Sequence, residues 1–335
     1  MLDINDFSQK QIIVFNPTRG DKISYRNDNM IVTDGDGNVK YQITCYRIFA
    51  VIVVGDCTFT TGIIRRAKKF GFSVVFMTYS FRYYAKLNAG LEGNSYLHEK
   101  QYRYTGTDIA KVLIFNKIKN QYSVLKNIRK KDEYTSEGIE LLKNYMSRML
   151  DDDISERNDI MAIEGNAARV YFQRLFVNSG WTGRKPRIKF DYINSLLDIG
   201  YTLLFNFIDS ILQVYDFDVY KGVLHTCFYQ RKSLVCDIME PFRPIIDWQV
   251  RKGINLQQFK KEDFIIIKDQ YQLEYKKTSE YVAVFMQEIL KYKQDIFLYI
   301  RSYYRAFMKE KSIKDYPIFD VVCGIVDVNS AEQGI

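Results

Sequence analysis

The residue types best able to do chemistry in this chain are a glutamate and, farther along, a histidine with further acids. Glu164 borders an apolar helical stripe, where an unpaired carboxylate is costly to bury, so it either turns to water or meets a cation or a metal ion. His225 and Glu240 both lie in the segment 219–247. If the two regions converge, their carboxylates and imidazole form a mixed oxygen and nitrogen site. Such a site suits Mg2+ or Mn2+, which can bridge phosphate oxygens at a reacting phosphodiester.

Ordinary structural roles compete with that interpretation inside the same segment. A lone histidine among apolar neighbours, such as His225, is usually a satisfied core residue. Asp237 and Glu240 form a D-x-x-E pattern, which before a helix is typical of an N-cap with its reciprocal acid. A helix that begins just after Glu240 would hold Pro241 and Pro244 in its first turn, where missing amide donors are harmless. Glu240 would then lie near the positive end of the helix dipole, which favours its ionised form.

Three cations could support the acids. Lys117, Arg169 and Arg243 are candidates either for contacts with phosphate or for pairing with a carboxylate inside the site. Their charge alone does not choose between these roles.

Several familiar enzyme classes are not expected. The sequence has no G-x-x-x-x-G-K-[ST] phosphate loop and no G-x-G-x-x-G, so a nucleotide-hydrolysing motor is not indicated. It also lacks the G-x-S-x-G nucleophile elbow, and His98 and His225 are its two histidines, so nothing supports a serine or cysteine hydrolase.

These side chains need two kinds of scaffold to position them. From residue 11 to about 88, short β-rich runs alternate with Gly, Asp and Asn turns, and one helix is predicted at 60–71 because Gly71 follows a cationic last turn. Beyond that region the apolar spacing predicts helices at 108–128, 136–151, 155–178, 190–215 and 280–310.

We therefore expect an α+β protein of two domains, a small N-terminal β-rich domain followed by a larger, mostly α-helical catalytic domain. Glycines and polar residues interrupt both periodicities at 88–101 and mark the boundary. The expected divisions are a β-rich domain at 1–92, a linker at 93–104, a helical domain at 105–320 and an unassigned tail at 321–335.

Composition points to an anionic partner and a reducing compartment. The chain of 335 residues has a net charge of +8 and a pI of about 9.0, which favours nucleic acid, although many basic proteins simply stay soluble in this way. Tyrosines and cations alternate at 251–315, so these helices form either a face for a nucleic-acid backbone or an ordinary solvated face.

The sequence predicts a cytoplasmic protein. It has five cysteines without a C-x-x-C pair, no signal sequence and no apolar run long enough to cross a membrane.

Several motifs together resemble the CRISPR-associated Cas1 family of spacer acquisition, both in order and in spacing. The strongest are IEGNAARVYF, GVLHT and LVCDIMEPFRPIID, at 163–172, 222–226 and 234–247. Supporting matches are VVGDCTFTTGIIRRAKKFGFSVVFMTY, FNKIKNQYSVLKNI and DYINSLLDIGYTLL. The resemblance covers about residues 8–315.

The resemblance implies a β domain used for homodimerisation and a helical domain in which Glu164, His225 and Glu240 hold Mg2+ or Mn2+. Asp237 corresponds to an auxiliary acid one turn before Glu240, and we expect Arg169 and Arg243 to act as supporting cations beside the three ligands. In this family two such dimers flank a dimer of a small ferredoxin-like protein, Cas2, and hold a short DNA fragment, the protospacer.

The implied chemistry is transesterification, in which the 3′-hydroxyl of the fragment attacks a phosphodiester at the repeat boundary of a CRISPR array and inserts a new spacer. Endonuclease activity is the same step with water as the nucleophile. Two alternatives remain open: a mobile-element integrase of the same superfamily, and a catalytically silent scaffold that binds DNA.

Overall fold

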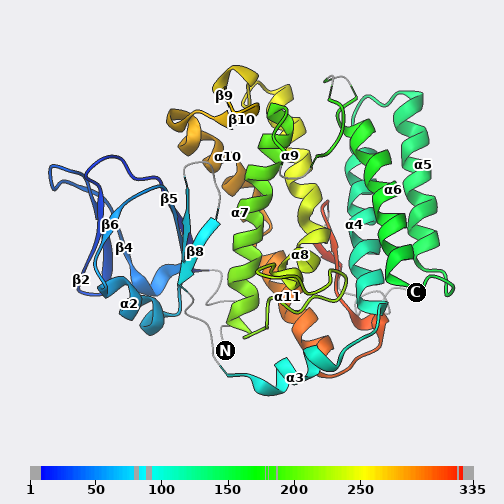
Figure 1. The fold of residues 1–335 in the computed structure, drawn as a ribbon, viewed down its shortest axis with the longest axis horizontal. Helices are drawn as coiled ribbons and strands as arrows, with labels where there is room; N and C mark the ends of the chain where they lie inside the picture. The colour runs from blue at the N-terminus through cyan, green and yellow to red at the C-terminus, as the bar shows by residue number, and fades with distance from the viewer. Residues whose placement is uncertain are drawn as a thin grey trace.

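The computed structural model of the chain describes residues 9–78, 83–87, 93–177, 179, 181–185, 188–322 and 324–326. A strand-rich region at the N-terminal end lies beside a larger helical region (Figure 1). The fold class predicted from the sequence, α+β with two domains, is confirmed. The expected boundary at residue 92 and residues 327–335 of the expected tail lie outside the described residues.

The N-terminal domain contains two sheets of four strands each, in the orders β1-β5-β7-β8 and β4-β3-β2-β6. In the first sheet β1, β5 and β7 are parallel and β8 is antiparallel. Its strands are β1 (Gln11–Phe15), β5 (Ile48–Val54), β7 (Ser73–Met77) and β8 (Tyr83–Leu87). The second sheet consists of β2 (Lys22–Arg26), β3 (Asn29–Thr33), β4 (Val39–Thr44) and β6 (Thr58–Phe59).

The continuous apolar run of β5 results from burial on both of its faces. Val51 and Val53 pack in a small core between the two sheets, whereas Ile52 and Val54 belong to the main core of the helical domain. A strand covered on both faces needs no polar positions, so its sequence shows no alternation. The same small core buries Ile63 of α2 (Gly62–Phe70), and this helix ends at Gly71 as the sequence predicts.

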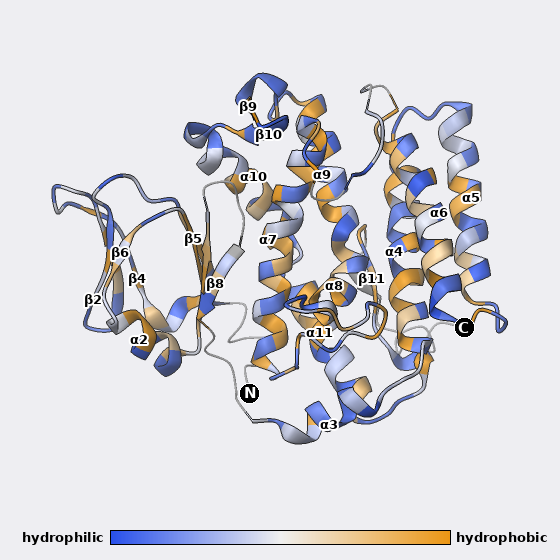
Figure 2. Cartoon of the chain, in the orientation of Figure 1, coloured by the Kyte–Doolittle hydropathy of each residue, from blue (hydrophilic) through white to orange (hydrophobic). Residues whose placement is uncertain are grey.

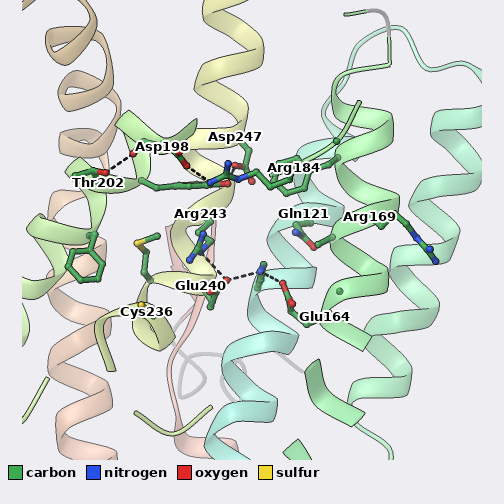
Figure 3. Close-up of a pocket in the computed structure, with 18 of the residues that line it drawn as sticks. Gln121, Glu164, Arg169, Arg184, Asp198, Thr202, Cys236, Glu240, Arg243 and Asp247 are labelled. Atoms are coloured by element: carbon green, nitrogen blue, oxygen red, sulfur yellow. Dashed lines mark hydrogen bonds and ion pairs between the residues drawn. The ribbon is translucent and has the colours of Figure 1, made fainter. Parts of the chain in front are cut away.

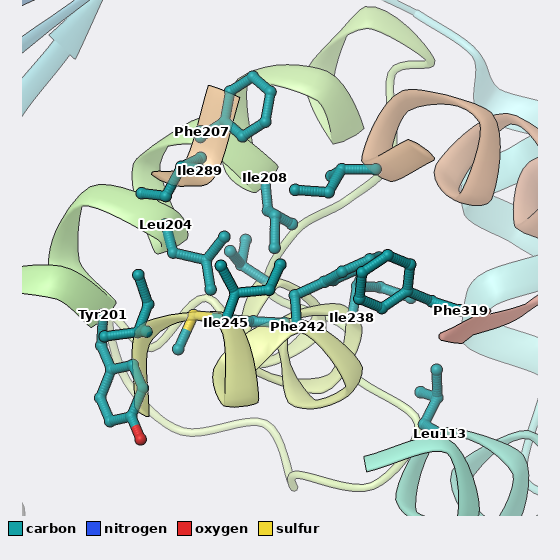
Figure 4. Close-up of a cluster of buried hydrophobic side chains, with 14 of the residues drawn as sticks. Leu113, Tyr201, Leu204, Phe207, Ile208, Ile238, Phe242, Ile245, Ile289 and Phe319 are labelled. Carbon is teal, nitrogen blue, oxygen red and sulfur yellow. The ribbon is translucent and has the colours of Figure 1, made fainter. Parts of the chain in front are cut away.

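The helical domain is built around α7 (Tyr192–Val214), which is rich in hydrophobic residues (Figure 2) and is largely buried. Side chains of α7, α4, α8, α9 and α10 share one buried cluster with Phe242 and Phe319 (Figure 4). Gly200 allows this packing, because a Cβ there would lie 2.4 Å from Ile246 Cγ2. Among the described helices, α7 alone is long and apolar enough to cross a membrane, but most of that stretch is buried inside the protein.

Four helices lie close to their predicted ranges: α4 (Asp108–Lys126), α5 (Glu133–Met149), α6 (Arg157–Leu175) and α7. The helix predicted at 280–310 is instead two helices, α10 (Thr278–Lys291) and α11 (Lys293–Met308), separated at Tyr292. The apolar spacing continues across this break, so periodicity alone does not reveal it.

Several local structures were not expected from the sequence. The expected linker contains the helix α3 (Ser95–Arg103), capped by Asn94, whose side chain accepts a hydrogen bond from the Leu97 amide. A hairpin of β9 (Phe264–Ile267) and β10 (Gln270–Leu273) precedes α10. A second hairpin joins β11 (Ile318–Asp320) to β12 (Gly324–Val326), so the described start of the unassigned tail is part of the fold.

The tyrosines in 251–315 serve mainly as core. Tyr281, Tyr299 and Tyr303 are fully buried in the aromatic packing of α10 and α11. These rings are therefore unavailable for stacking on nucleic-acid bases.

Candidate active site

Side chains from three elements meet around one buried lysine. Lys117 of α4 hydrogen-bonds to Glu164 of α6, and its Nζ lies 2.7 Å from Oε2 of Glu240. Glu240 is the first residue of the 3-10 turn η2 (Glu240–Phe242), which follows α8 (Ser233–Met239) directly. The Lys117 side chain is 8% exposed, that of Glu240 6%, and that of Glu164 27%. The structure thus brings two of the predicted acids together around a cation from the same chain.

Polar side chains of α4 fix the position of Lys117. Asn116 exchanges two hydrogen bonds with the backbone of Phe319 in β11. One turn later, Asn120 donates to the carbonyl of Pro241 at 2.9 Å. Because Pro241 adjoins Glu240, α4 holds both the lysine and the backbone that carries its partner. The motif FNKIKNQ is therefore explained by buried side chains on one face of α4.

Charge at this cluster favours the ionised carboxylate of Glu240. Burial alone would raise the pKa of Glu240, but Arg243 and Lys117 outweigh it and hold that pKa well below its usual value. Arg243 is the first residue of α9 (Arg243–Asn255), and its Nε lies 3.1 Å from Glu240 Oε2. Burial would lower the pKa of Lys117, yet Glu164 and Glu240 raise it. Both Lys117 and Arg243 therefore pair with carboxylates, one of the two roles that sequence analysis left open.

His225 lies in the loop between α7 and α8 and is oriented by Asp237. Its Nδ1 is 2.5 Å from Asp237 Oδ1, so the carboxylate favours the tautomer protonated at Nδ1 and leaves the Nε2 lone pair for a ligand. Asp237 also accepts hydrogen bonds from the amides of Val223, Leu224 and His225. Gly222 makes this contact possible, because a Cβ there would lie 2.6 Å from Asp237 Oδ2.

The predicted capping role of Asp237 is wrong. Asp237 lies inside α8, whose N-cap is Lys232, and it is fully buried against the loop that carries His225. The helix expected to start just after Glu240 is the continuation of α8 through η2 into α9. The two prolines do occupy first-turn positions, Pro241 in η2 and Pro244 in α9. The D-x-x-E spacing was misleading because it occurs across a junction between helices and not before one.

The predicted residues other than Asp237 face a common open groove. Lys117, Glu164, His225, Glu240 and Arg243 all line it. Arg169 also lines the groove, but its guanidinium hydrogen-bonds to Asn166 and extends away from the Lys117 cluster (Figure 3). Arg169 is therefore placed to meet a ligand along the groove and not to pair with the acids.

A comparison with known families identifies the chain. The model of the family described as CRISPR associated protein Cas1 matches residues 14–287. The chain belongs to the Cas1 family. This confirms the resemblance noted from the sequence motifs.

Cas1 relatives match over most of their length. A CRISPR-associated endonuclease Cas1 from Moorella thermoacetica is 31% identical over 248 residues, which cover 69% of this chain and 72% of the relative. Among solved structures, a casposase bound to integration product has a TM-score of 0.73 at 20% identity and covers 97% of this chain and 96% of its own. A chain of a Cas6-RT-Cas1--Cas2 complex has a TM-score of 0.79 at 22% identity and covers 93% of this chain, which spans 36% of that longer chain. These structures show that the Cas1 fold is shared.

The groove of this Cas1 chain also contains polar residues that sequence analysis missed. Arg184 pairs with Asp198 at 2.5 Å, and both Arg184 and Arg243 lie over the ring of Tyr201. The Tyr201 hydroxyl donates to Asp247, whose pKa is raised to about 7 by burial despite that hydrogen bond. The spacing of Asp198 and Tyr201 on one face of the predicted helix was an available signal. Arg184 lies in a loop, where no periodic pattern in the sequence could indicate its position in the groove.

The donor set suits a hard divalent cation. Two carboxylates and an imidazole nitrogen are ligands that Mg2+ or Mn2+ accept, and the carboxylates of Glu164 and Glu240 already enclose one cation, the Lys117 ammonium. In the arrangement described, no three His, Cys, Asp or Glu side chains of the described residues stand close enough together to hold a metal ion. A metal site here therefore requires side-chain movement, first of all by Lys117.

Proposed function

We propose that this Cas1 protein is a metal-dependent DNA endonuclease and integrase that inserts short foreign DNA fragments as new spacers into a CRISPR array. The observation that carries the proposal is the convergence of Glu164, His225 and Glu240 on one groove beside Lys117 and Arg243. Membership of the Cas1 family supports it, and the matching relative from Moorella thermoacetica is named an endonuclease.

Glu164, His225 Nε2 and Glu240 would hold Mg2+ or Mn2+. When bound, such an ion stabilises negative charge on phosphate oxygens and favours an ionised nucleophile. Asp237 keeps His225 in the tautomer that can bind it, and the buried hydrogen bonds of Asp237 keep the imidazole facing the groove.

The cations of the chain would prepare the groove for DNA. Arg243 keeps Glu240 ionised and in place. Lys117 holds Glu164 and Glu240 near each other, and with an ion bound it would be free to turn to a phosphate oxygen. Arg169, at the edge of the groove, would contact the DNA backbone.

The proposed reaction is a transesterification. The 3′-oxygen of the fragment forms a bond with phosphorus at the repeat boundary, the bond from phosphorus to the 3′-oxygen of the target strand breaks, and the attacking hydroxyl's proton passes to the departing oxygen through solvent. With water as the nucleophile, the same site cleaves DNA. One site therefore supports both the integrase and the endonuclease activity.

The assembly we propose is a homodimer formed through the β-rich domain, joined to a dimer of the small ferredoxin-like Cas2 protein. A solved chain that shares this fold comes from a Cas6-RT-Cas1--Cas2 complex, and another comes from a casposase bound to integration product. These structures support a DNA-handling complex as the working form.

The test is insertion of a labelled DNA fragment with 3′-hydroxyl ends into a plasmid that carries a repeat array, in Mg2+ or Mn2+ and with the Cas2 partner present. His225→Ala and Glu240→Ala should abolish insertion, and Glu164→Gln should reduce it at least about a thousandfold, because each removes a proposed ligand. Glu99→Ala is the matched control, since Glu99 is 53% exposed on α3 and pairs with Arg103. Undiminished insertion by His225→Ala would refute the site assignment.

Two further results would select the alternatives. Insertion that ignores the repeat when its sequence is scrambled indicates an integrase that moves its own element. DNA binding without cleavage or insertion at any Mg2+ or Mn2+ concentration indicates a catalytically silent scaffold.

A further inference from the structure

The strand β11, far along the chain from the candidate ligands, packs against the turn that carries Glu240. Phe319 of β11 is fully buried, and its ring centroid lies 4.7 Å from that of Phe242 (Figure 4). Phe242 is the last residue of the 3-10 turn η2, and Glu240 is its first. A ring of β11 therefore supports the turn that presents a proposed metal ligand.

One side chain of α4 binds this turn and β11 at the same time. Nδ2 of Asn120 donates to the carbonyl of Pro241 at 2.9 Å and to that of Phe319 at 3.1 Å. Its Oδ1 accepts from the amide of Val321, next to β11, at 2.9 Å. Asn120 is fully buried, so both of its amide hydrogens and its oxygen are used in these contacts. The side chain thus joins the middle of η2 to β11.

Other contacts hold β11 in place independently of Asn120. Asn116, one turn earlier on α4, exchanges two hydrogen bonds with the backbone of Phe319. The hydroxyl of Tyr292, between α10 and α11, donates to the carbonyl of Val321 at 3.0 Å. Because β11 is held from two sides, it can serve as a fixed reference for η2.

This buried polar network is not the most stable way to fill such a core. Burying an amide costs free energy unless each of its polar atoms is bonded, and apolar side chains of similar size avoid that cost. A fully bonded network instead favours one arrangement of the elements that it joins. Here it fixes the separation between α4, which carries Lys117, and η2, which carries Glu240.

We propose that Asn120, backed by β11, is a positioning residue for the metal ion, because it sets the place from which Glu240 can share that ion with Glu164. This inference rests on the proposed function and deepens it by giving β11 a part in forming the site. Neither Asn120 nor Phe319 lines the groove, so each would act through Glu240 and not by contact with DNA. The family model matches residues 14–287, so β11 follows the matched range.

The experiment measures Mn2+ binding to the full chain by calorimetry, and insertion of the labelled DNA fragment at increasing Mn2+ with the Cas2 partner present. Asn120→Ala separates η2 from β11 and should weaken Mn2+ binding about tenfold to a hundredfold. All three ligands remain, so its insertion should be slow at limiting Mn2+ and approach the wild-type rate as Mn2+ is raised. Glu240→Ala, which lacks a ligand, should not recover at any concentration.

A second variant reaches η2 from the other side. Phe319→Leu keeps Asn120 and its backbone partners but removes the ring that packs on Phe242. It should weaken Mn2+ binding about threefold to tenfold, less than Asn120→Ala does. It also provides the test if Asn120→Ala does not fold.

The matched control for lost stability is Gln101→Ala. Gln101 of α3 is buried, and its side-chain amide exchanges two hydrogen bonds with the backbone of Asp218, away from the groove lining. Because a similar set of buried bonds is lost, Gln101→Ala should be destabilised much as Asn120→Ala is. Its affinity for Mn2+ should stay within about twofold of the wild type.

Several results would overturn the inference and leave the proposed function standing. Wild-type Mn2+ affinity in Asn120→Ala or in Phe319→Leu does so, and so does insertion by Asn120→Ala that added Mn2+ fails to restore. An equal loss of affinity in Gln101→Ala also does so, because the effect would then follow stability. A wild type that neither binds Mn2+ nor inserts DNA overturns the proposed function together with the inference.

Discussion

Two buried charge clusters in this protein mirror each other. At the candidate active site one lysine, Lys117, lies between two carboxylates, Glu164 and Glu240. Between the domains one carboxylate, Asp209, lies between two lysines, with Lys86 and Lys232 each 2.9 Å from its Oδ2. Each cluster joins three separate elements.

The two clusters differ in their access to solvent. The Lys86 and Asp209 side chains are 2% and 0% exposed, and they connect β8 of the N-terminal domain to α7. Glu164 is 27% exposed and lines the groove. A closed cluster can only hold elements together, whereas an open one can exchange its cation for another. Access to solvent, more than residue composition, therefore distinguishes a structural ion cluster from a candidate metal site.

The largest expected effect is on the closed cluster. Asp209→Ala leaves Lys86 and Lys232 buried without their shared carboxylate, and we expect a loss of about 3–5 kcal/mol in the free energy of unfolding, measured by chemical denaturation. The matched control is Asp28→Asn, which removes the charge of the exposed pair with Lys69, keeps a residue suited to the φ of 58° at this position, and should cost less than about 1 kcal/mol. A loss in Asp209→Ala as small as in the control would mean that the cluster does not tie the domains together.

A substitution in the open cluster should cost less stability than one in the closed cluster, and added metal should restore part of that stability. Lys117→Met leaves Glu164 and Glu240 facing each other, and because Glu164 reaches solvent we expect a loss of about 2–3 kcal/mol without metal. Mg2+ or Mn2+ should then raise the melting temperature of Lys117→Met more than that of the wild type, because the ion replaces the lost ammonium. Asp209→Ala should show no such gain. An equal metal response in all three proteins would remove the distinction between the clusters.

Sequence reasoning could identify the acids and the histidine but not all of their contacts. Residue type made Glu164, His225 and Glu240 candidates, the family resemblance selected them as ligands, and the structure brings all three to one groove. The bridging position of Lys117 depends on packing between α4 and α6, which no local pattern encodes. The role of Asp237 was ambiguous because an N-cap and a carboxylate that orients a histidine share the same residue type.

In the fold, too, elements with a local sequence pattern could be predicted, whereas elements that depend on distant contacts could not. Helix α6 was predictable because its apolar stripe is local. The hairpin of β9 and β10 was missed because Ile265, Ile266 and Ile267 are all exposed and so show no alternation. Strand β5 lacks alternation for the opposite reason, since both of its faces are buried. In both cases the missing pattern reflects the surroundings of the strand.

Substitution of Asp237, which contacts His225 from the buried side of the site, should affect activity more than stability. Asp237→Asn places an amide where His225 Nδ1 needs an acceptor, so the imidazole loses its fixed tautomer. We expect insertion of DNA to slow about tenfold to a hundredfold and Mn2+ binding, measured by calorimetry, to weaken similarly. Circular dichroism should show an unchanged helical content, because the side-chain oxygen can still accept a backbone hydrogen bond. Wild-type Mn2+ affinity in this variant would show that Asp237 does not act through His225.

The smallest effect at neutral pH is expected for Lys86→Met, because Asp209 keeps Lys232 as its partner. Burial lowers the pKa of Lys86 to about 8 from the usual 10.5, although Asp209 acts in the opposite direction. Between those two pH values the unfolded chain binds more protons than the folded one, so the free energy of unfolding rises with pH in this window. The cost of burying the charge is present in full below pH 8 and is relieved above it.

The measurement is the difference in the free energy of unfolding between the wild type and Lys86→Met at several pH values from 7 to 10.5, which cancels the titration of the other lysines. Relative to the variant, the wild type should gain stability as the pH rises, while the two should differ by less than about 1 kcal/mol at pH 7. A constant difference across this range would mean that Lys86 is solvated in solution, and the contrast in access between the two clusters would then fail.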